Sequence, residues 1–475
     1  MKLWRAAAAL GAVAFSLAHV GSPDTIFEGQ AGPYAVRVVV RTPGVVPGLA
    51  DIAVRITGGP AGSRVVTVIP LRGGLPTAQE PPPDTARVVA GDSSLYSAQL
   101  WLMRFGAYSV RVTVDGAGGS GSAIVPVNAV AVGRLDMKRP VAIALIALGL
   151  FLFVGAVTIV YAAVRESVLP PGEIPSPRRQ RGAVVVAIVA AGLFIVYLLF
   201  GNWWWGLEDR AFRSRIYRAP EVTSAVVDRG EARVFRLTVA DSATFRRQMS
   251  PLIPDHGKLM HLFLVGASDQ AVAHLHPLPV DSTTFETALP PLPAGTYYVF
   301  ADIVHETGFS QTLTDTLALP AAAQPVWTPS DPDDAWLAGE SGTTIAWSRP
   351  AELRSGTDVN LTFAAPGAPL EPYMGMAGHA IVARSDGRVF VHLHPNGTIP
   401  RAAQLVYELR EPGDTVRGRL GQRITEREGA SHAHSVDAES VTFPYSFPEP
   451  GRYRIWVQIK SRGRIVTGAF EADVS

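Results

Sequence analysis

Residues 378–395 read GHAIVARSDGRVFVHLHP, and this stretch decides how the rest of the chain is interpreted. Asp386 and Gly387 lie between two apolar, β-branched runs, a pattern that predicts a β-hairpin closed by a two-residue type I′ turn. Such a turn sets the pairing of the two strands, because it places Ser385 opposite Arg388. The stretch therefore predicts two strands and also which of their residues face each other.

Counting outward from this turn brings three imidazoles together. Ile381 falls opposite His392, and His379 falls opposite His394. Side chains alternate between the two faces of a strand, so all four of these lie on one face of the hairpin. Opposed Cβ atoms are about 5 Å apart and diagonal ones about 7–8 Å apart, which suits three nitrogens bound to one metal ion.

The same pattern occurs earlier in the chain, in residues 261–277. There His274 and His276 follow His261 by thirteen and fifteen residues, the spacing found in the later stretch, and both copies end in HLHP. Strand-like segments flank both copies: residues 230–239 match 356–363 before the hairpin, and residues 293–303 match 449–459 after it. We interpret the two copies as tandem domains.

The composition is that of a β-rich chain without thiol chemistry. The 475 residues include 45 glycines and 38 prolines, spread between short runs rich in valine and threonine, which is typical of several β-sandwich domains. The 42 basic and 41 acidic residues nearly balance, at a net charge of +1, so nucleic acid is not an expected partner. The sequence has no cysteine, which excludes disulfides and thiolate metal sites.

Three apolar segments predict export and membrane anchoring. Residues 1–18 combine a basic start, an apolar run and small residues at the end, the pattern of a secretory signal peptide. Residues 141–164 and 183–201 are each long enough to cross a bilayer, so the lipid bilayer is an expected partner. If the signal exports the first soluble region, residues 165–182 form a cytoplasmic loop. Both large soluble regions then lie on the extracytoplasmic side of the cytoplasmic membrane.

We expect a mainly β fold with three immunoglobulin-like β-sandwich domains, the last two being the tandem repeat. The soluble parts are predicted as a first sandwich, the first repeat, a linker and the second repeat, in residues 19–135, 219–323, 324–341 and 342–475. Strand-like runs of the first sandwich cover residues 34–41, 51–56, 63–69 and 108–114. Its Trp101, Met103 and Tyr108 are expected in the core. The second repeat carries an insertion whose charged part, residues 417–429, is expected to be a loop.

Each histidine set predicts a metal site. A His-x-His on one strand with a third imidazole on the neighbouring strand is an arrangement that zinc or copper can use, with a fourth position left open. One buried histidine is more often a hydrogen-bonded core residue, but three on one face are costly to bury unless each ring has a partner. The candidate ligands are His261, His274, His276, Asp302 and His305 in the first copy, and Met374, Met376, His379, His392 and His394 in the second.

The additional donors would give the two copies different metal preferences. A thioether from Met374 or Met376 beside imidazoles suits copper(I), whereas Asp302 or His305 as a harder fourth donor favours copper(II) or zinc. Because metal ligation requires neutral imidazole, binding is expected to weaken below about pH 6.5, the unperturbed histidine pKa.

Short motifs resemble known domains of the bacterial envelope. Residues 373–379, YMGMAGH, followed by strands and a Gly-x-Tyr strand at Gly451, are similar to the small β-sandwich domains of the YtkA/FixH type and, more distantly, to the periplasmic copper-binding CopC sandwiches. Residues 106–112, GAYSVRV, resemble the same closing strand. The resemblance implies an envelope protein that handles metal, with copper as the cofactor and zinc as the alternative.

Three functions from different classes follow from these patterns. The first is a membrane-anchored extracytoplasmic copper-binding protein that holds ions or delivers them, with a metal transporter or an oxidase as partner. The second is a zinc-dependent hydrolase, which would need a general base beside the metal, such as Asp302 or His305. The third is a structural or sensor protein of the envelope whose histidines bind no metal.

Overall fold

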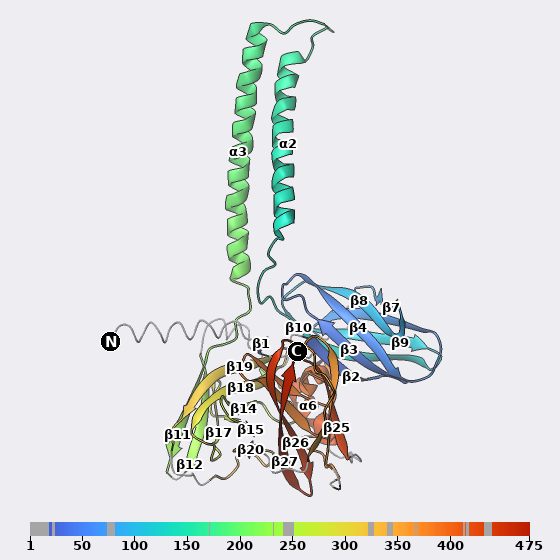
Figure 1. Cartoon of the computed structure of the whole chain (residues 1–475), viewed down its shortest axis with the longest axis vertical. Helices are drawn as coiled ribbons and strands as arrows, with labels where there is room; N and C mark the ends of the chain where they lie inside the picture. Colours follow the sequence, from blue (N-terminus) through green and yellow to red (C-terminus); the bar gives the residue numbers. More distant parts are fainter. Residues whose placement is uncertain are drawn as a thin grey trace, which may run out of the picture. The chain divides into compact units, whose positions relative to one another are not determined.

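The computed structural model describes most of the chain as two compact units. One unit contains Met1–Val130 and Arg218–Ser475, and the other is Ala131–Tyr217. The described residues are 19–20, 24–73, 81–170, 172–230, 232–240, 251–321, 327–339, 345–365, 367, 369–411, 414, 418–431 and 439–475. The predicted signal peptide, residues 1–18, lies outside them. The fold is mainly β, as the sequence predicts, with two long apolar helices in the second unit (Figure 1).

The first soluble region forms two sheets around one core. One sheet has the order β2-β3-β4-β8-β7 and the other β10-β9-β5-β6. Their bounds are Asp24–Ala31 (β2), Tyr34–Arg41 (β3), Gly48–Gly58 (β4), Arg64–Arg72 (β5), Asp84–Thr85 (β6), Arg87–Val89 (β7), Asp92–Leu102 (β8), Gly106–Gly116 (β9) and Gly119–Ala129 (β10). The four predicted strands correspond to β3, β4, β5 and β9. Alternating buried positions such as Val36, Val38 and Val40 build the core between the sheets.

The predicted core in this region is correct for one of three residues. Tyr108 is buried, but Trp101 and Met103 are 59% and 62% exposed. Trp101 lies near the end of β8, where its side chain points away from the opposing sheet, and Met103 follows the last strand residue. Residue type alone cannot reveal this, since side chains on the outer face of a strand and in loops face away from the core.

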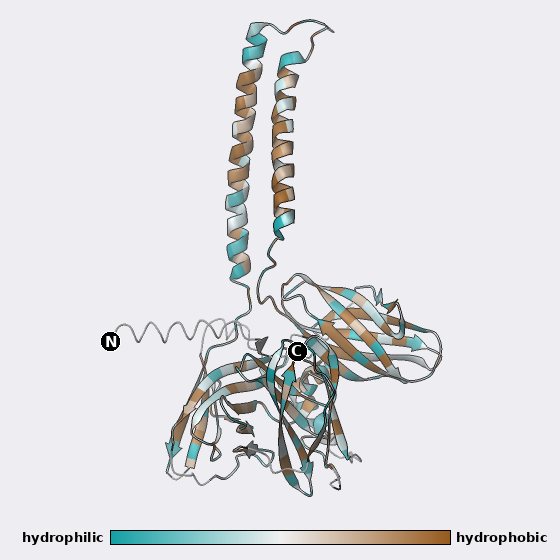
Figure 2. Ribbon diagram, viewed as in Figure 1, coloured by the Kyte–Doolittle hydropathy of each residue, from teal (hydrophilic) through white to brown (hydrophobic). Residues whose placement is uncertain are grey.

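Two helices of the second unit are long and apolar enough to cross a membrane. They are α2, Arg139–Glu166, and α3, Pro177–Arg213. Figure 2 shows their middle turns as hydrophobic and their ends as hydrophilic. The helix α3 extends beyond the predicted span at both ends: Ser176 caps its first turn by accepting from the backbone N–H of Arg179, and the helix continues through Gly206, after the tryptophans, to Arg213.

The first repeat also consists of two sheets. The order is β11-β12-β17-β16 in one and β13-β18-β14-β15-β20 in the other, where β19 pairs with β18. Their bounds are Val222–Arg229 (β11), Ala232–Val239 (β12), Leu252–Ile253 (β13), His261–Gly266 (β14), Val272–Leu275 (β15), Leu278–Pro279 (β16), Thr284–Ala288 (β17), Gly295–His305 (β18), Ser310–Leu319 (β19) and Ala335–Leu337 (β20). The strand β20 comes from the predicted linker. This segment is therefore part of the sheet of the first repeat, where Ala335 pairs with His274.

The second repeat has a three-stranded and a five-stranded sheet, in the orders β21-β22-β25 and β1-β24-β23-β26-β27. Their bounds are His19–Val20 (β1), Ala346–Ser348 (β21), Asp358–Ala364 (β22), His379–Arg384 (β23), Val389–Leu393 (β24), Ser440–Ser446 (β25), Gly451–Ser461 (β26) and Arg464–Val474 (β27). The strand β1, predicted within the first sandwich, pairs with β24 instead. The insertion contains two helices, α5 (Arg401–Leu409) and α6 (Arg419–Ser431), so its charged part is an amphipathic helix and not a loop.

The hairpin register of the second repeat is confirmed, whereas the turn type is wrong. Ile381 pairs with His392, as predicted. Of the two central residues only Gly387 has a positive φ, 71°, and its N–H donates to Arg384 O at 2.9 Å. A type I′ turn requires positive φ at both positions, so the loop is a turn over Ser385 and Asp386 followed by a left-handed glycine. Both kinds of turn pair the same residues across the two strands, so the histidines still lie on one face of the hairpin.

Both hairpins are buried on both faces. In β14, Leu262 and Leu264 face the core of the first repeat, while Phe263 and Val265 belong to a separate apolar cluster shared with the second repeat. Phe300 and Phe390, one from each repeat, stack in this cluster with ring centroids 4.0 Å apart. The two histidine-bearing sheets therefore pack against each other through their outer faces.

The first sandwich contacts the loop that follows the last histidine. The N–H of Ile26 donates to Thr398 Oγ1 at 2.9 Å, and the N–H of Thr398 donates back to Ile26 O at 2.9 Å. Ile399 completes the core of the first sandwich. Gly397 lies between these contacts with a φ of 114°, and a Cβ there would lie 2.0 Å from Ile26 O.

We predict that Gly397→Ala destabilises the junction between the first sandwich and the second repeat, at a cost of about 1–3 kcal/mol. Gly119→Ala is the matched control, because Gly119 has a similar φ of 101° but open space around the added methyl group. Thermal unfolding of both variants checks this. Equal midpoints for the two variants would show that backbone strain alone, and not the contact with Ile26, sets the cost.

Candidate metal centre

Seven histidines from the two repeats gather between the packed sheets. None of them is more than 7% exposed. They are His256, His261, His274 and His276 of the first repeat, and His379, His392 and His394 of the second. Ring contacts cross between the repeats: the centroid of His392 lies 5.3 Å from that of His261 and 5.5 Å from that of His274. The predicted two sites are thus neighbours in one interior.

Two groups of three imidazoles have their nitrogens close enough for one ion each. In each group the three ligand atoms lie within 4.8 Å of one another. The first group is the predicted set His261, His274 and His276. The second contains His379 and His394 together with His256, which comes from the other repeat. His392 lies between the groups, with its centroid 4.5 Å from that of His394 and 5.2 Å from that of His379.

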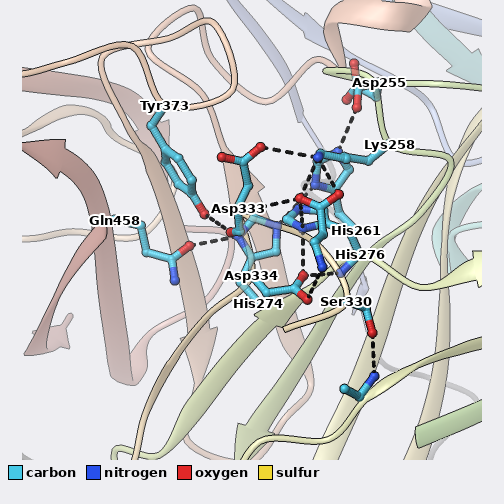
Figure 3. A network of polar contacts seen from close by, with 12 residues as sticks. Asp255, Lys258, His261, His274, His276, Ser330, Asp333, Asp334, Tyr373 and Gln458 are labelled. Carbon is cyan, nitrogen blue, oxygen red and sulfur yellow. Dashed lines mark hydrogen bonds and ion pairs between the residues drawn. The ribbon is translucent and has the colours of Figure 1, made fainter. Parts of the chain in front are cut away.

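Protein oxygens determine which nitrogen carries the proton in the first group. His261 Nε2 lies 3.0 Å from Asp255 O, and His274 Nδ1 lies 2.8 Å from Gln458 Oε1. His276 Nδ1 lies 3.0 Å from Asp334 Oδ1 (Figure 3). Each of these oxygens is an acceptor, so each of these nitrogens donates its N–H. Metal-binding histidines are typically oriented by such outer hydrogen bonds.

The remaining nitrogens then carry lone pairs directed into the cluster. His261 Nδ1 and His274 Nε2 lie 3.1 Å apart, although each ring already donates through its other nitrogen. Two lone pairs at this distance repel unless a cation lies between them. His276 Nε2 has no hydrogen-bond partner among the described residues. The first group therefore presents three unprotonated nitrogens to one point.

The second group has the same character. His394 Nδ1 donates to Ile399 O at 3.1 Å, and its Nε2 has no partner within the described part of the chain. Both ring nitrogens of His379 and Nε2 of His392 also have no hydrogen-bond partner among the described residues. Buried polar atoms without a partner are rare in proteins and mark sites that bind something or store strain.

A clamp from the insertion positions His256. This residue and Gly257 form a tight turn with positive φ values of 53° and 78°. Both of their N–H groups donate to the carboxylate of Glu428 on α6, each at 3.0 Å. Asp255, which begins the turn, accepts from the N–H of Ala402 on α5 at 2.7 Å. The two inserted helices thus attach the turn of the first repeat to the second repeat.

The outer hydrogen bonds cross between the repeats. Asp302 and Gln458 hold equivalent places, because each pairs with the first histidine of its own sheet. Gln458 bonds His274 of the other repeat, and Asp302 Oδ2 lies 3.6 Å from Nδ1 of His392, also in the other repeat. The arrangement therefore has an approximate two-fold relation in which one half carries a carboxylate and the other an amide.

Burial keeps the imidazoles neutral. It lowers the pKa of His261, His274, His379 and His392 well below the usual value, and neighbouring imidazoles lower it further. Burial also lowers the pKa of His276 and His394 to about 4. The lone pairs therefore stay available at pH values below 6.5, which moves the expected loss of metal binding to lower pH than the sequence alone indicates.

Two predicted donors of the first site lie elsewhere. Asp302 faces His392 of the second repeat, and burial raises the pKa of its carboxyl to about 7. His305 lies at the end of β18, where its Nε2 is 2.8 Å from Gln311 Nε2, and it belongs to neither imidazole group. Asp302 and His305 lie apart because they are three positions apart on one strand, and side chains an odd number of positions apart point to opposite faces.

The predicted methionine donors stay predictions. Met374 is buried and Met376 is half-buried, and both lie in a turn closed by Tyr373 N–H to Met376 O at 2.8 Å. Met374 and Gly375 have positive φ, as His256 and Gly257 have in the first repeat. Met374 therefore holds the place of His256, and both lie five residues before the first histidine of their hairpin. That equal offset is the sequence signal that sets His256 apart as a further candidate ligand.

A third group of possible ligands is an ion-pair network behind the first site. It joins His276, Asp331 and Asp334. Lys258 Nζ lies 2.6 Å from Asp331 and 3.2 Å from Asp333, so an ammonium already neutralises these carboxylates (Figure 3). Asp334 is the member that orients a ring, since its Oδ1 accepts from both Nδ1 and the backbone N–H of His276.

The histidine repeats coincide with a recognised sequence family. A family model described as a domain of unknown function (DUF8832) matches residues 221–319 and 338–475. No curated protein matches the chain. The resemblance to YtkA/FixH and CopC domains stays a prediction.

Solved structures resemble the chain only loosely. A putative membrane anchored protein from Corynebacterium diphtheriae is 9% identical, with 95% of this chain and 94% of that chain covered and a TM-score of 0.15. An ectodomain fragment of ICAM-5 is 10% identical, with 95% of this chain and 83% of that chain covered and a TM-score of 0.14. A Salmonella alpha-2-macroglobulin is 10% identical, with 96% of this chain and 24% of that chain covered and a TM-score of 0.19. Scores this low carry no argument about fold or function.

We predict that Asp334→Ala weakens metal binding by about 10–100-fold, because His276 loses the acceptor that orients its ring. Asp333→Ala is the matched control: it removes a neighbouring carboxylate that lies 3.2 Å from Lys258 Nζ and, among the described residues, forms no hydrogen bond with a histidine ring. Competition with a chromophoric copper chelator measures both affinities. Equal affinities in the two variants would mean that Asp334 does not act through His276.

Proposed function

We propose that this chain is a membrane-anchored protein that binds transition-metal ions, copper in preference to zinc, between its two repeats. The observation that carries the proposal is the 3.1 Å separation of His261 Nδ1 and His274 Nε2, two nitrogens that both lack a proton. Two nitrogens bound tetrahedrally at about 2.0–2.1 Å to one ion lie about 3.3 Å apart. The lowered pKa of both rings disfavours a proton as the alternative cation.

The donor set favours copper. Each of the two groups consists of three imidazoles, and neutral imidazole suits copper and zinc alike. By the general order of divalent metal affinities, copper(II) outcompetes zinc at such nitrogen sites. Because every histidine of the centre is buried, the geometry supports an ion that is retained. Delivery to a transporter or oxidase would require the two sheets to separate.

One observation favours the alternative of a zinc-dependent hydrolase. Asp302, with its pKa raised by burial to about 7, lies beside His392 and has the character of a general base. Hydrolysis also needs an open metal position that water and substrate reach. The burial of all seven rings argues against such access and ranks this function second.

The cellular placement belongs to the same proposal. Residues 1–18 act as a signal peptide, α2 and α3 cross the cytoplasmic membrane, and residues 165–182 hold the short connection on the cytoplasmic side. The first sandwich and both repeats, each immunoglobulin-like, then lie on the extracytoplasmic side. The predicted signal and the apolar character of α2 and α3 support this arrangement.

Metal analysis of the full chain in detergent tests the function. We expect copper to bind and to resist exchange with equimolar zinc, and His274→Ala to lose at least tenfold in affinity. His305→Gln serves as the control, because it alters a buried histidine outside both groups. A folded protein that takes up neither copper nor zinc would leave the structural or sensor reading in place. Zinc retained against copper would favour the hydrolase.

Fusions to a reporter that is active only outside the cytoplasm test the placement. We expect activity from fusions after Val132 and after Ser475, and none from a fusion at Pro175 in the connection between α2 and α3. The reverse result, with activity at Pro175 and silence at Ser475, would place the histidine centre in the cytoplasm.

A further inference from the structure

We infer that the centre holds two ions that interact as one pair, with His392 positioned between them. This inference rests on the proposed metal binding and adds to it the number and coupling of the ions. It starts from the crossing of the groups. The second group takes His256 from the first repeat and is therefore shared between the two repeats. The three rings of the first group all belong to the first repeat, but Gln458 of the second repeat bonds one of them, His274.

The separation between the groups is short. The ring of His256, in the second group, has its centroid 6.2 Å from that of His261 in the first. The ring of His274, in the first group, has its centroid 6.4 Å from that of His379 in the second. Within the second group the ring centroids of His256 and His379 are 5.3 Å apart, so these two distances between the groups exceed it by only about 1 Å. Two ions bound here share a single interior.

The nitrogens are too numerous for one ion. The first group offers three lone pairs, from His261, His274 and His276. Nitrogens of His379 and His394 add to these, and Nε2 of His392 has no hydrogen-bond partner among the described residues. Tetrahedral and tetragonal ions accept about four strong nitrogen donors each. One ion would therefore leave several buried lone pairs without a partner, whereas two ions provide enough coordination positions for them.

His392 is the residue that both ions would approach. The centroid of its ring lies 5.3 Å from that of His261 and 5.5 Å from that of His274, both in the first group. It lies 5.2 Å from that of His379 and 4.5 Å from that of His394, both in the second group. Asp302 lies behind it at 3.6 Å from Nδ1. A neutral imidazole in that place has one lone pair, on Nε2, for an ion, and the carboxyl group that faces Nδ1 makes the ring a stronger donor.

The test is copper(II) loading of the full chain in detergent, with metal content measured by mass spectrometry and unpaired spins by electron paramagnetic resonance. We expect two copper ions per chain and a spin count clearly below the copper content, because two nearby spins couple. His276→Gln should remove the ion of the first group and leave one copper whose spin count equals the copper content. His394→Gln should remove the ion of the second group with the same effect on the spin count. His305→Gln should keep both ions and their coupling.

The other possible results separate a failure of metal binding from a failure of the ion pair. No bound metal in folded wild-type chain removes the proposed function itself. One copper per chain keeps metal binding and overturns the pair, and two coppers with a full spin count show two independent sites. Because these results come from the unmutated chain, they hold even if a histidine variant fails to fold, which circular dichroism would reveal.

Discussion

The architecture depends on how the nitrogens of the buried imidazoles are satisfied. Each neutral ring has one N–H and one lone pair, and burying either without a partner costs free energy. Most of the N–H groups described for the centre find oxygens: a turn carbonyl at Asp255, an amide at Gln458, a carboxylate at Asp334 and a loop carbonyl at Ile399. These oxygens come from different segments, so the segments must all be in place before the lone pairs converge.

This requirement explains why distant parts of the chain meet at one point. The segment between the repeats adds β20 to the first sheet and brings Asp334 to His276. The insertion helices hold the turn of His256 through Glu428 and Ala402. The first sandwich supports the loop that carries Ile399. Such supports around a site keep its side chains in one geometry, which is what preorganised binding needs.

Much of the fold could be predicted because it follows from local periodicity. Strand alternation and the position of Gly387 determine that His379 and His392 share a face, even though the turn type differs. The interface between the repeats could not be predicted by treating each hairpin alone, although runs such as HLFLVG, apolar at nearly every position, indicate a strand buried on both faces. His256 and Asp302 lie against histidines of the other repeat, and the spacing of residues within one hairpin does not indicate such contacts between repeats.

The approximate two-fold relation is one that two identical subunits could not form. In a dimer of identical subunits, a residue and its symmetry mate must be the same, so Asp302 and Gln458 could not differ, nor could His256 and Met374. Duplication within one gene removes that constraint, since each copy mutates separately while the interface is kept. Two copies within one chain can therefore carry the unequal pairs, and one half of the centre can differ in its donors while the other half stays the same.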